Sequence, residues 1–277
     1  MKKCKLFSLL SFLFMISLVL CTISYAEPVE KSIDVKKFYE TQVELPEEKT
    51  PLEPRNYSLT KEEKPFVEIE RSSLAKVYDE SGVVIDTYQI KSNLDSRKSL
   101  TAATEGKVAT VLIAADEEYR KKFSNWQERT SNIVELTDNA FVRDFNIDLD
   151  VKAFRYWTST GSDTTQILSN LKGNGKDDYD FVIGFVADAN YMEGGRAYIY
   201  KSPPTYAAYS TVLDQTTTST SRALQHEISH NYGLDHDPLA AEPLCIMNYE
   251  NMYTTTQWHA DHKNELGIHV NWYGTSF

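Results

Sequence analysis

The stretch LQHEISHNYGLDHD, residues 224–237, holds three of the six histidines of the chain. If residues 226–232 form a helix, His226 and His230 lie one turn apart on the same face, because an α-helix has 3.6 residues per turn. Two imidazoles on one face can bind one metal ion at the Zn–N distance of roughly 2.0–2.1 Å. Glu227 stands beside them, close to a water on the metal without being a ligand. A general base is needed at that place.

Gly233 predicts the end of this helix. Glycine tolerates positive φ, so the chain can turn sharply there and return His236 to the same metal as a third ligand. Three protein ligands and a fourth position open to water are typical of a catalytic zinc site. The sequence therefore predicts one catalytic Zn²⁺ held by His226, His230 and His236. The alternative is that these are ordinary core or solvated histidines.

The spacing H-E-x-x-H-x-x-G-x-x-H matches the long signature of the metzincin zinc peptidases at every fixed position. A second element supports the resemblance: Met247, eleven residues after His236, has the order and spacing of the metzincin Met-turn. The resemblance covers the chain from about Lys107 to the C-terminus. It implies a metzincin-like catalytic domain with a twisted mixed sheet, an active-site helix and a C-terminal helix.

Within the metzincins, the chain looks most similar to the adamalysin (reprolysin) branch, in which an aspartate such as Asp237 follows the third histidine. Cys245 departs from that branch, because its counterpart there forms a disulfide; a buried, inert thiol is favoured instead. Tyr249, two residues after Met247, resembles the Met-turn tyrosine of astacins and serralysins. The resemblance implies that Tyr249 approaches the zinc and has a catalytic role. The alternative is a buried tyrosine with a hydrogen-bonded hydroxyl.

The resemblance implies a zinc-dependent endopeptidase. Zinc would activate its bound water and polarise the scissile carbonyl, while Glu227 would take the proton and pass it to the leaving amine. Metzincins bind substrate as an extended strand, and GGRAYIY, residues 194–200, is the candidate edge. Two other functions stay open. One is a non-enzymatic, zinc-stabilised peptide-binding protein, which would not need Glu227; the other is a zinc hydrolase of a non-peptide amide.

Residues 1–26 have the anatomy of a secretory signal peptide. Three lysines precede an apolar run over residues 6–21, and Ser-Tyr-Ala at 24–26 fits a cleavage site. We therefore expect a secreted, extracellular protein. The alternatives are an uncleaved membrane anchor and lipidation at Cys21.

Charge and cysteine content narrow the partners. Without residues 1–26, the chain carries 26 basic and 40 acidic residues, a net charge of −14. This balance argues against nucleic acid and anionic membranes, so a protein or peptide substrate is expected and no stable membrane partner. Cys245 is then the only cysteine, which excludes an intramolecular disulfide and favours a bacterial source. The sequence leaves the oligomeric state open.

Residues 27–105 are typical of an acidic pro-region or tether, with scattered prolines among Glu and Lys. Residues 74–90 nevertheless predict a β-hairpin. As a pro-region, this segment could keep the enzyme latent by placing a carboxylate on the open zinc position. The candidates are Asp79, Asp86 and Asp95.

Residues 106–277 predict an α/β layered domain, the zinc peptidase domain, because strand and helix patterns alternate. Strands are expected at 108–115, 147–157, 180–188 and 194–200, and helices at 116–145 and 164–173. The Thr/Ser run at 216–221 predicts the cap of the motif helix.

Two further patterns are weaker indications of metal binding. His259 and His262 stand three apart in WHADHK; a second metal is an alternative, but a surface helix face is favoured. GNGKDDYD, residues 173–180, is only partly similar to a calcium loop, so a polar turn that leads into a strand is favoured.

Overall fold

The computed structural model describes residues 43–44, 50–52, 70–93, 106–238 and 244–276. All of them belong to one compact unit, Tyr39–Phe277. The predicted signal peptide, residues 1–26, lies outside the described residues, and so does Asp95. No helix within the described part is long and apolar enough to cross a membrane.

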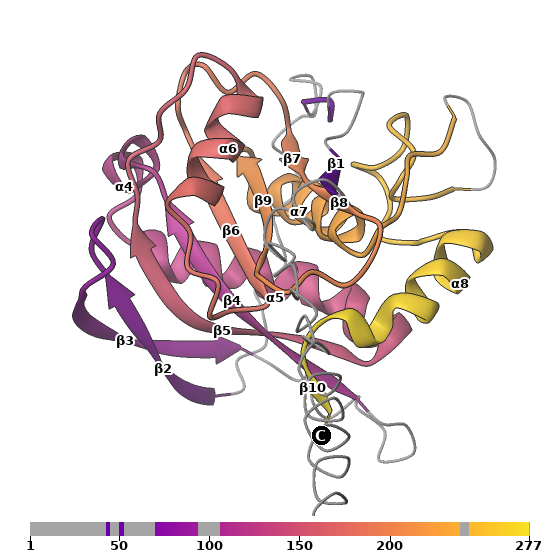
Figure 1. The fold of residues 1–277 in the computed structure, drawn as a ribbon, viewed down its shortest axis with the longest axis horizontal. Coiled ribbons are helices and arrows are strands. Elements are labelled where there is room, and N and C mark those ends of the chain that lie inside the picture. The colour runs from indigo at the N-terminus through magenta and orange to yellow at the C-terminus, as the bar shows by residue number, and fades with distance from the viewer. Residues whose placement is uncertain (1–42, 45–49, 53–69, 94–105, 239–243, 277) are drawn as a thin grey trace, which may run out of the picture. The chain divides into compact units, whose positions relative to one another are not determined.

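Among the described residues, eight strands form a mixed sheet in the order β3-β2-β5-β4-β6-β9-β7, with β10 beside β4 (Figure 1). These strands are β2 (Glu70–Tyr78), β3 (Val84–Asn93), β4 (Lys107–Ala115), β5 (Ile147–Tyr156), β6 (Phe181–Val186), β7 (Gly195–Ala197), β9 (Ala208–Leu213) and β10 (Thr275–Ser276). Strands β2, β5, β4, β6 and β9 pair in parallel, whereas β3, β7 and β10 pair antiparallel with their neighbours. The predicted α/β layered fold is confirmed.

The apolar run of β4 is buried on both faces of the sheet. Its residues alternate: Val111 and Ile113 contribute to one hydrophobic core, and Leu112 and Ala114 to the other. A strand with two buried faces has no polar side and therefore reads as a continuous apolar segment. Helices must then cover both faces.

Helices α5 (Trp126–Phe145) and α7 (Thr217–Asn231) cover one face, and α6 (Thr164–Gly173) covers the other (Figure 1). A short helix α4 (Glu117–Lys122) precedes α5, and α8 (Ala260–His269) leads into a 3-10 turn, Val270–Trp272, near the C-terminus.

The single helix predicted over residues 116–145 is wrong, because the structure divides it into α4 and α5. Asp116 caps α4, and Phe123 ends it in an extended conformation with φ −124° and ψ 107°. The Phe123 ring packs on Tyr119 at 5.0 Å and lies under the Arg129 guanidinium at 4.4 Å. Phe123 makes these contacts from an extended backbone, so α4 ends before it. The sequence contains no glycine or proline at this position that would have predicted the end of the helix.

The hairpin predicted within residues 74–90 is confirmed as β2 and β3, which turn at Gly82 with φ 84°. Strand β2 also pairs in parallel with β5, at residues 76–78 against 153–155. This hairpin is therefore part of the central sheet. The boundary expected at residue 106 falls between strands of that sheet.

Helix α7 ends at Gly233 in a Schellman motif. The Gly233 N–H donates to the His230 carbonyl at 2.8 Å, and the Leu234 N–H donates to the Ser229 carbonyl at 3.2 Å. Gly233 has φ 91°, and a Cβ there would lie 2.9 Å from the Tyr200 carbonyl oxygen. Only glycine fits both the backbone angle and the neighbouring strand.

We predict that Gly233→Ala destabilises the protein by about 2 kcal/mol, because a left-handed alanine costs roughly 1–2 kcal/mol before the contact with Tyr200 is counted. This loss lowers Tm by roughly 4–8 °C for a domain of this size. Gly267→Ala is the control, since its Cβ meets nothing within 4 Å on exposed α8. It should stabilise by about 0.5–1 kcal/mol. Equal melting temperatures for the two variants would contradict the role of Gly233.

Candidate active site

The structure brings His226, His230 and His236 together around one point. Their Nε2 atoms lie 3.0 Å apart for His226 and His230, 3.2 Å for His226 and His236, and 2.8 Å for His230 and His236. A tetrahedral zinc site with Zn–N bonds of roughly 2.0–2.1 Å needs ring nitrogens at about this spacing. The predicted helix spacing and the turn at Gly233 together produce this convergence.

Backbone carbonyls fix which nitrogen of each helical ring carries the proton. The Nδ1 of His226 lies 2.9 Å from the Ile246 carbonyl, and the Nδ1 of His230 lies 2.7 Å from the Leu234 carbonyl. A carbonyl only accepts, so each Nδ1 is the donor and each Nε2 keeps a free lone pair. Neutral rings with inward lone pairs are the donor set that zinc prefers.

Burial keeps the three rings neutral. It lowers the pKa of His226 to about 3 and that of His236 to about 4, and it lowers the pKa of His230 well below its ordinary value. The rings therefore offer lone pairs rather than positive charge at neutral pH. The Nε2 lone pairs of His226 and His230, 3.0 Å apart, repel each other unless a cation lies between them, so the residues present fit a bound zinc ion.

Helix α7 is held rigidly. Thr216 caps it by accepting a hydrogen bond from the Ser219 N–H at 3.1 Å, which confirms the cap predicted from the Thr/Ser run. At the other end, the Asn231 amide donates to the Tyr198 carbonyl at 2.9 Å. Every residue from 223 to 231 is buried. The helix thus holds two of the three rings within the core.

Glu227 is fully buried against edge strand β7, which lies across from the histidines. A Cβ at Gly195 would lie 2.5 Å from Glu227 Oε1, so only glycine lets the carboxylate approach this strand. Oε1 accepts a hydrogen bond from the Thr50 hydroxyl at 2.9 Å, and Oε2 has no hydrogen-bond partner among the described residues. Burial raises the pKa of Glu227 to about 8, against the opposing effects of Thr50 and Arg196.

The turn that contains Met247 is bonded to two segments of the site. Met247 is fully buried, and its carbonyl accepts from the Asp237 N–H at 3.0 Å. The neighbouring Ile246 carbonyl holds His226, as described above. This turn therefore fixes both the helix and the return segment. That placement is the one expected of a Met-turn.

Tyr249 contacts two of the three histidines. Its hydroxyl lies 2.9 Å from His236 Nε2, and its ring stacks 5.6 Å from the ring of His226. Its side chain is only partly buried. The hydroxyl therefore lies beside the nitrogens that would bind a metal, as the resemblance implied.

Residues 50–52, which we call the N-terminal strap, lie across Glu227; nothing in the sequence pattern singled them out. The Thr50 carbonyl accepts from the Gly194 N–H at 2.9 Å, and the Pro51 carbonyl accepts from the Tyr253 hydroxyl at 2.6 Å. Just upstream, β1 (Val43–Glu44) pairs antiparallel with β8 (Ile199–Tyr200). Edge strand β7 and strand β8 make up the predicted GGRAYIY edge, so this edge is partly covered by the chain itself.

Of the three carboxylates expected to block the zinc, Asp79 and Asp86 are engaged elsewhere, and Asp95 lies outside the described residues. Asp79 accepts from the Ser81 hydroxyl at 2.7 Å within its own hairpin turn, and these bonds lower its pKa. Asp86 accepts from the N–H of its neighbour Thr87. Thr50, a hydroxyl rather than a carboxylate, reaches the site instead.

The two weaker patterns have different outcomes. The surface helix face predicted for His262 is wrong: the side chain is buried, and its Nδ1 lies 3.3 Å from Cys245 Sγ. Burial raises the pKa of Cys245 to about 11, in keeping with a buried thiol. Around residues 173–180, Asp177 accepts from Tyr209 and Asp180 from Thr110, which agrees with a polar turn.

Comparison with known proteins shows which family this chain belongs to. The family model Reprolysin_5, described as Metallo-peptidase family M12, matches residues 105–260, more than half of the chain. No curated protein matches the chain.

Two solved structures are similar at low identity. One is titled "Structure of a chaperone-substrate complex"; it is 14% identical with a TM-score of 0.46, and the match covers 70% of this chain and 40% of that one. The other is the crystal structure of metalloproteinase-II from Bacteroides fragilis, also 14% identical, with a TM-score of 0.43 and coverage of 67% and 62%. The chain thus spans less than two thirds of either structure. By the match over more than half of its length, this chain belongs to metallo-peptidase family M12 and carries a metzincin-like metallopeptidase domain.

Proposed function

We propose that the chain is a secreted zinc endopeptidase that cleaves peptide bonds in protein or peptide substrates. The observation that carries this proposal is the convergence of three neutral imidazoles at 2.8–3.2 Å beside a buried carboxylate. Secretion rests on the signal-peptide pattern of residues 1–26. A library of diverse peptides, incubated with the chain with and without a chelator, tests the activity.

His226, His230 and His236 would hold the zinc, which when bound supplies a Lewis acid that polarises the scissile carbonyl and makes a water more acidic. Glu227 would transfer the proton of the attacking water. Its free Oε2 can accept a proton from a water and return it to the leaving amine. Burial raises its pKa to about 8, while a cation at the three nitrogens would favour the ionised, proton-accepting form.

We predict that Glu227→Gln lowers turnover by roughly 10²–10⁴-fold, the usual contribution of a general base, while metal content and Tm stay close to wild type. Glu250→Gln is the matched control, because it removes an exposed carboxylate near the same turn. Both variants are measured with and without Thr50→Ala, so that latency does not hide the result. Undiminished turnover in Glu227→Gln would contradict the proposal. Absence of chelator-sensitive cleavage in every background would favour a non-enzymatic peptide binder.

We further propose that the N-terminal strap keeps the enzyme latent. The Thr50 hydroxyl donates to the Glu227 carboxylate, the group that must accept the proton. The Thr50 carbonyl accepts from the Gly194 N–H, a donor that an extended substrate would need. A Cβ at Gly194 would lie 2.5 Å from the Pro51 carbonyl oxygen, so the strap fits closely against this edge. The base and part of the substrate edge are therefore covered by the same residues.

Thr50→Ala should raise peptidase activity of the full chain by about 10-fold, because a hydrogen bond to a charged group contributes roughly 1.5–3 kcal/mol to holding the strap. Thr87→Ala, on the exposed hairpin strand β3, is the control and should leave activity unchanged. The measurement is the initial rate on a peptide cleaved by the wild type or by Thr50→Ala. Identical rates for Thr50→Ala and wild type would leave residues 50–52 without an inhibitory role.

Tyr249 is proposed to stabilise the transition state. Its hydroxyl lies at the mouth of the three-histidine group and can donate to the oxygen that becomes negative during hydrolysis. The competing role is packing, in which the hydroxyl only holds His236. The two roles differ in what the hydroxyl contributes to rate and to stability.

For Tyr249→Phe we expect kcat to fall by roughly 10²–10³-fold, the usual effect of losing one oxyanion donor, with KM and Tm nearly unchanged. A packing role instead gives near-normal kcat and a stability loss of about 1 kcal/mol. Steady-state kinetics and thermal unfolding on the same preparation separate the two. Normal kcat would retire the catalytic role.

A further inference from the structure

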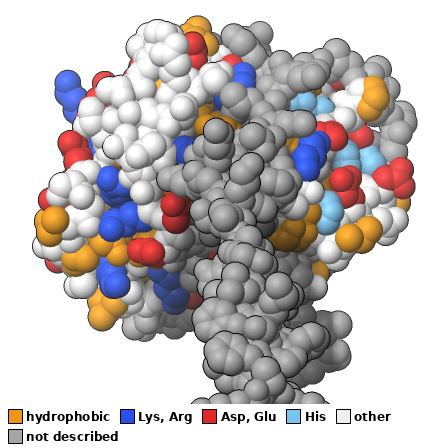
Figure 2. Space-filling model, in the orientation of Figure 1, with side chains coloured by type: hydrophobic (Ala, Val, Ile, Leu, Met, Phe, Trp, Pro, Cys, Tyr) orange, Lys and Arg blue, Asp and Glu red, His pale blue; other side chains and the backbone are white. Residues whose placement is uncertain are grey.

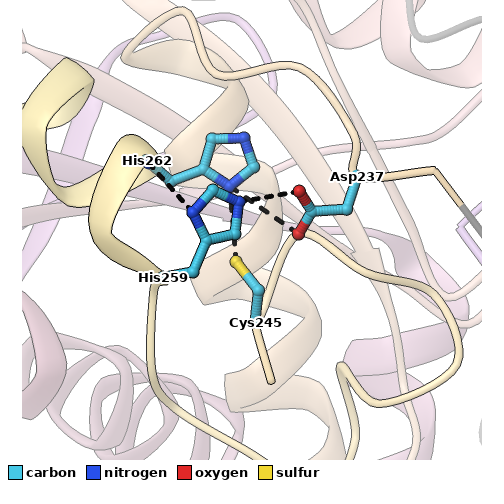
Figure 3. A group of neighbouring side chains, drawn as sticks. All are labelled: Asp237, Cys245, His259 and His262. Atoms are coloured by element: carbon cyan, nitrogen blue, oxygen red, sulfur yellow. Dashed lines mark hydrogen bonds and ion pairs between the residues drawn. The ribbon is translucent and has the colours of Figure 1, made fainter. Parts of the chain in front are cut away.

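A second group of metal-binding side chains lies next to the three histidines. It consists of Asp237, Cys245, His259 and His262, whose side chains point toward one another (Figure 3). One donor atom from each residue lies within 4.8 Å of the donor atoms of the others. The group joins three segments: the residue after His236, the start of the Met-turn and the N-terminal turn of α8.

The distances within the group are those of donors around a common centre. Cys245 Sγ lies 3.3 Å from His262 Nδ1, and His262 Nδ1 lies 3.9 Å from Asp237 Oδ2. Zinc bonds of roughly 2.0–2.3 Å in a tetrahedron place neighbouring ligand atoms about 3.3–3.6 Å apart. His259 Nε2 approaches Asp237 Oδ1 at 2.8 Å and completes the fourth side.

One oxygen of the group is buried, and its contact with His262 Nδ1, at 3.9 Å, is longer than a hydrogen bond. Asp237 Oδ2 has no hydrogen bond among the described residues, although the exposed fraction of its side chain is only 9%. A buried carboxylate oxygen without a hydrogen bond is costly, and a cation placed between Oδ2, Cys245 and His262 would compensate it. This oxygen faces the inside of the group rather than solvent.

We propose that Asp237, Cys245, His259 and His262 hold a second, structural zinc ion. One sulfur, two imidazoles and one carboxylate make a closed four-ligand set, in contrast to the three-histidine site with its open position. The mixture of thiolate and imidazole favours zinc over magnesium or calcium, which prefer oxygen donors. The ion would tie α8 and the Met-turn to the return segment that carries His236.

Loading this site moves two protons. Cys245 binds as a thiolate and releases its proton to solvent. His259 Nδ1 now accepts from the N–H groups of Asp261 and His262 at 3.1 and 3.5 Å, so its proton is on Nε2. Zinc at Nε2 shifts that proton to Nδ1, and the cap of α8 is given up. The loss of one cap is small beside the binding free energy of a structural zinc site.

The charge of the surface near α8 affects how a metal ion would reach this group. Acidic and histidine side chains lie side by side on the face over α8 (Figure 2). The exposed fractions of the His259 and His262 side chains are 13% and 10%, so the group is shielded but lies near this face. A divalent cation is therefore attracted to the place where the donors are found.

Cobalt binding to the chain without residues 1–26 tests the proposal. We expect two Co²⁺ per wild-type chain, with a thiolate-to-cobalt charge-transfer band, because Cys245 is the thiol in the group. Cys245→Ser should lose that band and bind one Co²⁺, because Cys245 is the only cysteine once residues 1–26 are removed. His226→Ala should keep the band while losing one ion, independently of any peptidase activity.

His262→Ala should also bind one Co²⁺, and His269→Ala on the same helix should bind two. If Cys245→Ser fails to fold, the wild-type spectrum and the His262→Ala variant still decide the question. One Co²⁺ per wild-type chain without a thiolate band would overturn the proposal. So would a band that persists in folded Cys245→Ser.

Discussion

Three imidazole Nε2 atoms are held within 3.2 Å of one another, and the rest of the site depends on this constraint. The arrangement persists only because backbone carbonyls fix the outward protons of His226 and His230, and because α7 is buried between the sheet and α5. The sharp turn at Gly233 then brings the third ring to the first two. The Nε2 lone pairs of His226 and His230 lie 3.0 Å apart before any metal binds, and a cation at this point would compensate their repulsion.

Edge strand β7 sets the second constraint, because it lies against the buried carboxylate of Glu227 and next to Gly194, which contacts the strap. Gly195 lets Glu227 approach the strand, and Gly194 lets Pro51 do so from the other side. The Gly194 N–H, one of the two donors that hold the strap, is a donor that an extended peptide added to this edge would use. Under the proposed latency, inhibition and substrate recognition therefore share this donor, and a substrate must displace the strap rather than find a separate groove.

Much of this could be predicted from the sequence, because local rules govern it. The spacing of His226 and His230 follows from helix geometry, the turn at Gly233 from backbone angles, and the buried strands from apolar runs. The rest depends on contacts between distant segments. The meeting of Thr50 with Glu227 joins residues 177 positions apart, and no local pattern signals it. The end of α4 at Phe123 likewise depends on Arg129 and Tyr119, not on a helix breaker.

The misjudged surface position of His262 has the same origin. Its spacing from His259 is compatible with an exposed helix face, and only the packing of α8 on Cys245 and Asp237 buries it. A signal was nevertheless present: the chain has six histidines, and five of them fall into the two groups described here. A rare residue type that is concentrated in a few short segments can therefore indicate a metal-binding group even where the periodicity of the sequence does not.

Diffraction from a crystal of the zinc-loaded chain, recorded on both sides of the zinc absorption edge, tests the central claim most directly. We expect an anomalous peak at roughly 2.0–2.1 Å from the Nε2 atoms of His226, His230 and His236. Density for the three rings with no anomalous peak between them, in crystals grown with excess zinc, would contradict it.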